Sequence, residues 1–293
     1  VLDQPINCQK QQGRLCCLLV TLMTKKPIND STPCAMTIAG SDSGGGAGIQ
    51  TDLKTFAGFE VHGTSVVTCV TAQNPHGVLD IQPISSRVVE KQFEALLNGF
   101  KPKAVKSGML FASSIVKAVV NGLTMEKPDW YVMDPVMVAT SGGCLLKSSC
   151  IQLIQKKLIP LADLITPNIA EAEVLLGVSI RTNSQVKNAV KKLVDRYERP
   201  FLLKGGHLPS KGLAVDYLYD GQTMTLLESK YIHGRKTHGT GCTYAAAITA
   251  QLALGKSLIP AVTIAKKFIS KAISHSYKTG HYEALNIWKA ASA

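Results

Sequence analysis

The feature that most constrains the fold is a regular alternation of short apolar runs with longer segments of helical periodicity. The first run, Ala35–Gly40, ends in glycine and is typical of a buried strand, and Ile49–Phe56 then carries apolar residues at helical spacing. A second strand is predicted to end near Gln73, and the serines that begin "SSRVVEKQFEALLNGF" precede an amphipathic helix. This alternation implies right-handed crossovers, and therefore an α/β fold with a mostly parallel sheet covered by helices on both faces.

The rest of the chain continues this pattern. Further strand-like runs are "AVKSGML", "WYVMDPVMV", "DLITPN" and "FLLKGGH", and the clearest helix spans Val186–Tyr197. Within Val215–Leu227, Asp220-Gly221 separates two strand-like runs, which predicts an antiparallel hairpin at one edge of the sheet. We expect helices over Thr243–Leu254 and Leu258–Tyr277.

The size of the chain is compatible with one large domain. It has 293 residues, of which 45% are hydrophobic, and no linker-like break follows the first strand. We therefore expect a single domain over residues 35–293, preceded by a tail over residues 1–34 that is disordered or has a misassigned start. Met23 is a candidate functional start, and a weak targeting segment is the alternative.

Charge and cysteine usage bear on partners and compartment. The formal net charge is +12, but the lysines are scattered, which fits solvated helix faces or a diffuse field that attracts anionic substrates. The eight cysteines form no CxxC pair and have no zinc-site spacing, as expected of a reduced intracellular chain. No nucleic-acid-binding motif is present, and the apolar run after Arg14 is too short to span a bilayer. We therefore expect a cytoplasmic protein that binds neither nucleic acid nor membrane.

Six polar segments each follow a predicted strand directly. They are "GSDSGGGAG", "TAQN", "SGM", "DPVM", "TPNIAEAE" and "KGGH". In an open parallel sheet, ligands bind outside the carboxyl ends of the strands. The six segments are therefore predicted to form one site.

The segment Gly239–Cys242, "GTGC", opens a predicted helix and suits an anion. Glycines let a ligand approach the backbone, and the N–H groups of a helix start stabilise the charge of a transferring phosphoryl group. A start that needs only a flexible cap is the alternative. For Cys242 the interpretations left open are a nucleophile with a base such as His238, a thiol whose pKa the helix lowers, and a packing residue.

The other candidates are less specific by themselves. The turn Ser43–Gly48 matches neither a Walker loop nor a dinucleotide fingerprint, and is a substrate cradle, a lid hinge or a solvent loop. Asn168 and Glu171 stand at a predicted helix start, where the carboxylate could hold Mg²⁺ through water or simply favour the helix dipole. Asp134 and Lys204 follow strands, and a lysine beside two glycines suits a phosphate, although such lysines are also often merely solvated.

Taken in order, the motifs of this chain resemble those of one enzyme family. The motifs "TIAGSDSGGGAGIQTDLKT", "VTAQN", "KSGML", "DPVMVATSG", "LITPNIAEAE", "LLKGGH" and "THGTGCT" resemble the hydroxymethylpyrimidine/phosphomethylpyrimidine kinases of thiamine biosynthesis, in the ribokinase-like superfamily. The resemblance covers about Ala35 to Tyr277 and implies a central sheet flanked by helices, with a small lid. It also implies that ATP with Mg²⁺ phosphorylates 4-amino-5-hydroxymethyl-2-methylpyrimidine and then its monophosphate, and that the chain forms a homodimer.

The same resemblance implies roles for individual residues. Gln73 would hydrogen-bond the aminopyrimidine edge, because an amide both donates and accepts. Cys242 takes the position where sugar kinases of the superfamily have an aspartate base. The remaining implied roles are apolar substrate contacts from Ala47, Met109 and Val136, an anion hole from Gly239, Thr240 and Gly241, ATP contacts from Lys204, Asp134 and Asn168, and Mg²⁺ binding through water by Glu171.

Three alternatives remain. A pyridoxal kinase of the same branch is the closest, but kinases with that dual activity tend to carry a cysteine just after "DPVMV", where this chain has Ala139. A non-catalytic binding protein on the same fold is disfavoured by the intact motifs, and a cysteine hydrolase by the lack of a placed His–Asp pair. Near the C-terminus, "TGHYEALN" departs from the "GHGxGP" stretch of many relatives, a peripheral difference expected to affect oligomer contacts or the tail.

Overall fold

A central sheet organises the molecule. The computed structural model describes residues 32–74, 76–137, 148–206, 208, 212–235 and 238–292. Within them, nine strands form one sheet in the order β3-β2-β1-β4-β5-β6-β7-β8-β9. The strands are β1 (Cys34–Asp42), β2 (His62–Asn74), β3 (Gly77–Pro83), β4 (Ala104–Ser107), β5 (Trp130–Met133), β6 (Leu164–Ile165), β7 (Phe201–Leu203), β8 (Leu213–Tyr219) and β9 (Met224–Lys230).

The sheet is parallel in its middle and antiparallel at its edges. Strands β2, β1, β4, β5, β6 and β7 pair in parallel, with Ala35 of β1 opposite Gly63 of β2 and Ala104 of β4. The hairpin predicted around Asp220-Gly221 is confirmed, because β8 and β9 pair antiparallel at one edge. The other edge strand, β3, pairs antiparallel with β2 and was not predicted.

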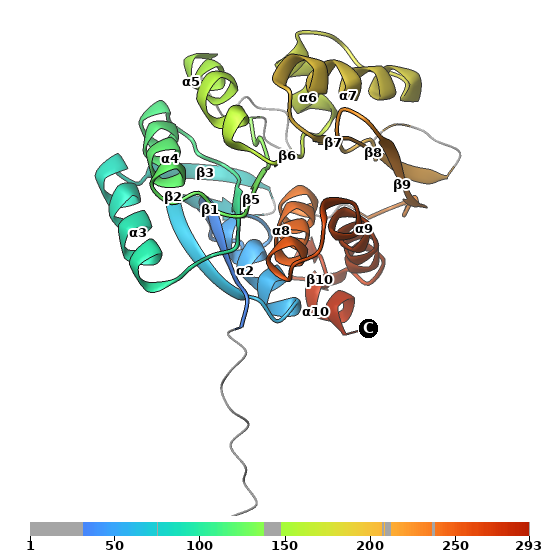
Figure 1. Cartoon of the computed structure of the whole chain (residues 1–293). Coiled ribbons are helices and arrows are strands. Elements are labelled where there is room, and N and C mark those ends of the chain that lie inside the picture. The colour runs from blue at the N-terminus through green and yellow to red at the C-terminus, as the bar shows by residue number, and fades with distance from the viewer. Residues whose placement is uncertain are drawn as a thin grey trace, which may run out of the picture. The chain divides into compact units, whose positions relative to one another are not determined.

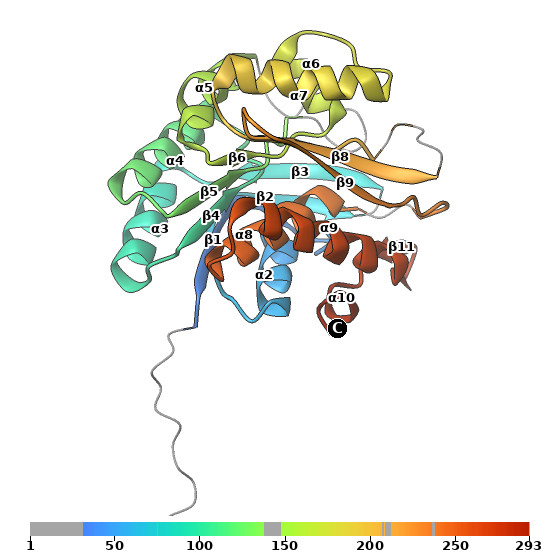
Figure 2. The same ribbon diagram turned by 45° about the vertical axis from the view of Figure 1, so that its right-hand side comes forward.

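Helices cover both faces of the sheet (Figure 1, Figure 2). One face carries α3 (Ser86–Gly99), α4 (Ser113–Met125), α5 (Ser148–Leu153), α6 (Ile169–Leu176) and α7 (Asn183–Tyr197). The other face carries α2 (Gly48–Gly58), α8 (Thr240–Ala253), α9 (Leu258–Ser274) and α10 (Ile287–Ala291). Each face has its own apolar core, so the predicted two-layered covering of the sheet is confirmed.

Local sequence signals explain where several helices begin. The Ser85 hydroxyl accepts the Val88 N–H at the start of α3, and Thr182 and Gln185 form a reciprocal capping box at α7. Helix α8 differs, because its N-cap is Gly239, which has no side chain to cap the helix. The positive end of the helix dipole at this start favours an anion.

The C-terminal segment departs from the expected continuous helix. Helix α9 ends at Ser274, and Tyr277–Thr279 (β10) then pairs antiparallel with Tyr282–Ala284 (β11) before α10. Arg235 forms an ion pair with Glu283, so this small hairpin is tied to the segment after β9. The expectation that the last helix extends to Tyr277 is thus wrong by about one turn.

Residues from Pro33 onward form one compact unit. The domain boundary at residue 34 stays a prediction.

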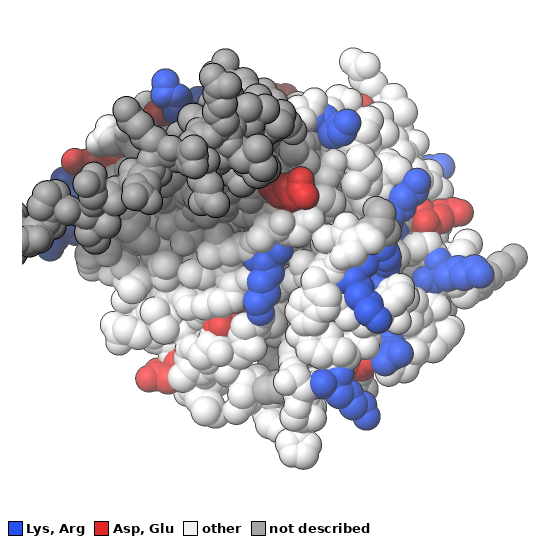
Figure 3. Space-filling model, turned by 90° about the horizontal axis from the view of Figure 1, so that it is seen from below, with Lys and Arg blue, Asp and Glu red and all other residues white. Residues whose placement is uncertain are grey.

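The charged side chains are dispersed over the surface that is seen from below. Lysine and arginine side chains lie among uncharged residues there, several of them on one side (Figure 3). No helix in the described part of the chain is long and apolar enough to cross a membrane.

Candidate active site

The polar segments predicted to form one site do meet at the carboxyl ends of the parallel strands. Asp42 is the last residue of β1, Gln73 lies at the end of β2, and Asp134 follows β5. Lys204 directly follows β7, where it forms an isolated bridge with Asn168 beyond β6. Helix α8 begins beside these residues, as the contacts below show.

Asp42 organises the glycine-rich loop between β1 and α2. Its buried carboxylate accepts the N–H groups of Gly44, Gly46 and Ala47 at 2.8, 3.1 and 2.8 Å. These three charge-assisted hydrogen bonds fix the conformation of a loop that its glycines would otherwise leave flexible. Sequence reasoning missed Asp42, although an aspartate that precedes a serine–glycine run is a known signal for such a turn.

The glycine-rich loop packs directly against the start of α8. Gly239 has a φ of 78°, and a Cβ built on it would overlap the carbonyl oxygen of Gly46. The Gly48 N–H, at the start of α2, is close enough to the Cys242 thiol to lower its pKa. Two helix N-termini therefore face the same region, which favours negative charge there.

Asp134 and Lys204 form the charged part of the site. Their Oδ1 and Nζ atoms are 2.8 Å apart, and the Thr166 hydroxyl donates to the same Oδ1 at 3.1 Å. A Cβ built on Gly241 would lie 3.2 Å from Lys204 Nζ, so the lysine stands against the first turn of α8. Burial lowers the pKa of Lys204, but Asp134 and Glu171 more than offset this, so the pKa is raised and the lysine stays charged.

Asn168 and Glu171 form a capping box at the start of α6. Asn168 Oδ1 accepts the Glu171 N–H at 2.9 Å, and Glu171 Oε2 accepts the Asn168 N–H at 2.8 Å. Burial raises the pKa of Glu171 to about 8, Lys204 opposes this shift, and Asp134 adds to it. The side-chain oxygen of Asn168 is thus committed to holding Glu171 rather than turned to a ligand.

The carboxylates fit a magnesium ion that arrives with a nucleotide. Glu171 and Asp134 supply the oxygen donors that Mg²⁺ prefers, and a nearby cation would relieve the repulsion that raises the pKa of Glu171. Among the described residues, no three His, Cys, Asp or Glu side chains gather closely enough to hold a metal by themselves. This suits an ion held largely by phosphates and water.

Gln73 lies beside His238, shortly before the start of α8. The Nε2 atoms of Gln73 and His238 are 2.8 Å apart, and the Thr71 hydroxyl donates to Gln73 Oε1 at 3.3 Å. His238 Nε2 also lies 3.9 Å from Asp42 Oδ2.

The three predicted apolar contacts are half-buried residues near the same strand ends. A Cβ built on Gly40 would lie 3.9 Å from Met109 Sδ, and one built on Gly239 would lie 3.2 Å from Ala47 Cα. Val136 donates its N–H to the Asp134 carbonyl at 2.9 Å. Ala139 and the rest of "DPVMVATSG" beyond Met137 lie outside the described residues.

The expectation that the helix start lowers the pKa of Cys242 is wrong. Burial raises the pKa of the thiol to about 11, although Lys106 and the Gly48 N–H oppose this. Cys242 is therefore a protonated thiol at neutral pH in this structure.

The segment "TGHYEALN" is not peripheral to the site. The Tyr282 hydroxyl donates to the His238 carbonyl at 3.4 Å, and a Cβ built on Gly46 would overlap this tyrosine. The hairpin β10-β11 therefore touches both the glycine-rich loop and the residue before "GTGC". The sequence difference from many relatives in this segment therefore lies in contact with the site, contrary to the prediction.

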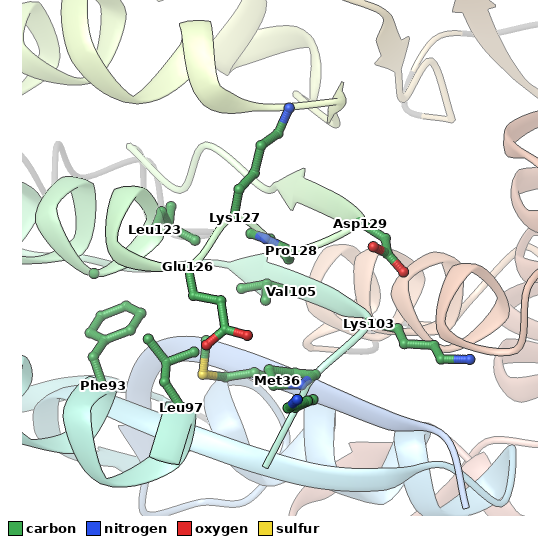
Figure 4. A pocket seen from close by; sticks show the side chains of 13 residues that line it. Met36, Phe93, Leu97, Lys103, Val105, Leu123, Glu126, Lys127, Pro128 and Asp129 are labelled. Atoms are coloured by element: carbon green, nitrogen blue, oxygen red, sulfur yellow. The ribbon is translucent and has the colours of Figure 1, made fainter. Parts of the chain in front are cut away.

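A separate cavity of about 210 Å³ lies at the opposite end of the sheet (Figure 4). Met36, Phe93 and Leu97 line one side of it, and the side chains of Lys103 and Lys127 extend away from them. None of the predicted site residues lines this cavity. Its position at the amino ends of β1 and β4 separates it from the site described above.

The fold and the site together define a kinase of the ribokinase-like class, with a helix N-terminus, a lysine and carboxylates at the sheet rim. Residues 42–286 match the model of the family described as phosphomethylpyrimidine kinase, and this chain belongs to that family.

Relatives and solved structures agree with this assignment. The chain is 46% identical over 84% of its length to a hydroxymethylpyrimidine/phosphomethylpyrimidine kinase of Haemophilus influenzae, 92% of which is covered. It is 43% identical over 83% of its length to a thiamine biosynthetic bifunctional enzyme of Arabidopsis thaliana, of which it spans 47%.

Among solved structures, a phosphomethylpyrimidine kinase from Clostridium difficile 630 is 40% identical, with a TM-score of 0.72, and the match covers 82% of this chain and 99% of that one. An ADP complex of Bacillus subtilis pyridoxal kinase is 35% identical, with a TM-score of 0.81, and the match covers 88% and 98% of the two chains.

Proposed function

We propose that this chain is an ATP-dependent kinase of thiamine biosynthesis. It phosphorylates 4-amino-5-hydroxymethyl-2-methylpyrimidine and then phosphorylates the monophosphate to the diphosphate. The observation that carries the proposal is that Lys204 and Asp134 lie against Gly241 in the first turn of α8, while Gln73 lies beside His238, just before that helix. A phosphoryl group at the start of α8 would therefore be close to both its donor and its acceptor.

The phosphoryl group is held mainly by charge and backbone. The N–H groups of Gly239, Thr240 and Gly241 form the anion hole, and Lys204 contacts the transferred phosphate. Asp134 keeps Lys204 in place, and Asn168 fixes Glu171 through the capping box. Mg²⁺ bound with ATP supplies charge neutralisation, and Glu171 would hold it through water.

The acceptor is bound beside Gln73, shortly before the start of α8. Gln73 pairs with the aminopyrimidine edge once its amide turns from His238, and Ala47, Met109 and Val136 supply apolar contacts. In the first phosphorylation the Cys242 thiol first releases its proton to solvent, and the thiolate then accepts the proton of the substrate hydroxyl. The second phosphorylation has a phosphate as acceptor and needs no strong base.

Pyridoxal kinase is the second candidate, because several of the similar solved structures are pyridoxal kinases of Bacillus subtilis and Staphylococcus aureus, with TM-scores of 0.79 to 0.81. Their sequence identities of 32–35% are lower than the 40% of the Clostridium enzyme. The pyrimidine is therefore the preferred acceptor.

The deciding experiment measures ATP turnover with the pyrimidine alcohol, its monophosphate and pyridoxal in parallel. The proposal expects both pyrimidines to be phosphorylated with higher kcat/KM than pyridoxal. Equal rates on pyridoxal would favour the second candidate, and no turnover with any acceptor would leave only a binding protein on the kinase fold. A Cys242→Ala variant should lose the first activity more than the second.

The oligomer and the cellular compartment belong to the same proposal. We infer a homodimer in the cytoplasm, on the likeness to the family and on the absence of a membrane-spanning helix in the described residues. Sedimentation equilibrium tests the dimer, and a monomer at micromolar concentration would contradict it.

A further inference from the structure

A buried ion pair lies outside the residues used so far. Lys106 of β4 and Asp52 of α2 have no exposed side-chain surface, and Nζ and Oδ2 are 2.9 Å apart. The Thr37 hydroxyl donates to the same Oδ2 at 2.6 Å, whereas Asp52 Oδ1 has no hydrogen-bond partner among the described residues. A buried pair of this kind adds little stability compared with an apolar pair, so its presence calls for another explanation.

The pair joins the two elements against which α8 packs. Helix α8 contacts both α2, which carries Asp52, and β4, which carries Lys106. Asp52 lies one helical turn after Gly48, the first residue of α2. A Cβ built on Gly108 would lie 3.4 Å from Lys106 Nζ, which places the ammonium at the end of β4.

The charges around Cys242 have opposing effects. Lys106 lowers the pKa of the thiol, and Asp52 and Asp134 raise it; Lys204, whose pKa responds to Cys242, is the fourth charged group that faces it. Burial lowers the pKa of Lys106, but Asp52 and Cys242 more than offset this, so the lysine stays charged. Lys106 is thus a positive charge that lowers the pKa of the thiol.

We propose that Lys106, held by Asp52, is a positioning residue that stabilises the Cys242 thiolate and so sets the proton affinity of the base in the first phosphorylation. The inference rests on the proposed function. The thiol releases its proton to solvent, and the thiolate accepts the proton of the substrate hydroxyl. That oxygen bonds to the γ-phosphorus of ATP as the bond to the β–γ bridging oxygen breaks and ADP leaves. The thiol then returns the proton to solvent.

The test uses reactivity of the thiol, which requires no turnover. The rate of Cys242 alkylation by iodoacetamide is measured by peptide mass spectrometry from pH 7 to 10.5 in the full chain. Lys106→Met removes the positive charge and should slow alkylation at pH 8 by about tenfold, while Asp52→Asn removes the negative charge and should speed it by a similar factor. Opposite changes in the alkylation rate of the two variants are expected only if the charges of Lys106 and Asp52 act on the thiol.

The chain provides matched controls. Lys266 forms a second buried pair with Asp216, at 2.6 Å, and neither residue is among the main groups that shift the pKa of Cys242. Lys266→Met should therefore leave the alkylation profile of Cys242 unchanged. Alkylation of Cys150, which is buried in the core on the other face of the sheet, reports any general loosening of the fold.

Each outcome decides the proposal. If both Lys106→Met and Asp52→Asn speed alkylation, or if neither changes it, the pair is structural and the proposal fails. If Lys106→Met does not fold, Asp52→Asn decides alone: it must speed Cys242 alkylation without exposing Cys150. Inactivity of the wild type on every acceptor would overturn the proposed function and would leave the alkylation result standing.

Discussion

The contact between the glycine-rich loop and the start of α8 makes Gly239→Ala the most informative substitution. Gly239 has a φ of 78°, and its Cβ would overlap the Gly46 carbonyl. Gly255, just after the same helix, has a φ of 82°, and a Cβ there would meet nothing within 4 Å. Both substitutions carry the same backbone cost, and only the first carries a clash.

The comparison of Gly239→Ala with Gly255→Ala gives the expected losses of stability. A left-handed conformation costs an alanine about 1 kcal/mol, so Gly255→Ala should lower the free energy of unfolding by that amount and Tm by about 2 °C. Gly239→Ala adds about 1–3 kcal/mol for the displaced backbone, which lowers Tm by about 4–8 °C. Since the displacement moves an anion-hole donor, kcat should also fall by on the order of 10²-fold.

Urea denaturation and steady-state kinetics with saturating ATP provide both measurements. Gly255→Ala should retain the wild-type kcat. Equal losses of stability in the two variants would show that the loop and the helix do not touch at Gly239. A stability loss without a loss of kcat would remove Gly239 from the anion hole.

Three further predictions concern the polar groups of the site. Asp42→Ala leaves three N–H donors without their acceptor and should lower the free energy of unfolding by about 2–4 kcal/mol, with a smaller loss for Asp42→Asn, measured by urea denaturation. The pKa of Glu171 rises from 4.5 to about 8 on folding, so its contribution to stability is full below pH 4.5 and is lost as the pH rises to 8. Without nucleotide, Glu171→Gln should therefore be more stable than wild type at pH 8, by on the order of 4 kcal/mol, and about equally stable at pH 4.5, as measured by thermal denaturation. Gln73→Leu should raise KM for the pyrimidine by on the order of tenfold and leave KM for ATP unchanged, and a change in both would remove Gln73 from the acceptor side.

The sheet and its rim could be predicted because the signals are local. Buried parallel strands appear as short apolar runs, and the polar segments that follow them lie at one edge by topology alone. Strand β3 was missed because most of its side chains are exposed and it pairs only with β2. An edge strand of this kind has neither an apolar run nor a clear alternation.

Residues of the site were missed for two different reasons. Asp42 stands in a local turn signal that was overlooked, whereas Lys106 and Tyr282 owe their positions to contacts that the surrounding sequence does not encode. Lys106 lies in a short strand, where a lysine is ordinarily expected to reach solvent, and only the approach of Asp52 from α2 accounts for its burial. Tyr282 meets Gly46 from the far end of the chain, so no spacing rule connects them.

The burial of Cys242 makes this residue less important for the reaction than the sequence suggested. A thiol whose pKa burial raises to about 11 is rarely deprotonated at neutral pH unless charge is rearranged around it. In the proposed mechanism both phosphorylations share the anion hole, whereas only the first needs a base. The substitution-sensitive part of the site should therefore be the backbone contact between the glycine-rich loop and α8. Changes at Cys242 should alter which of the two acceptors is phosphorylated, while changes at Gly239 should impair both reactions.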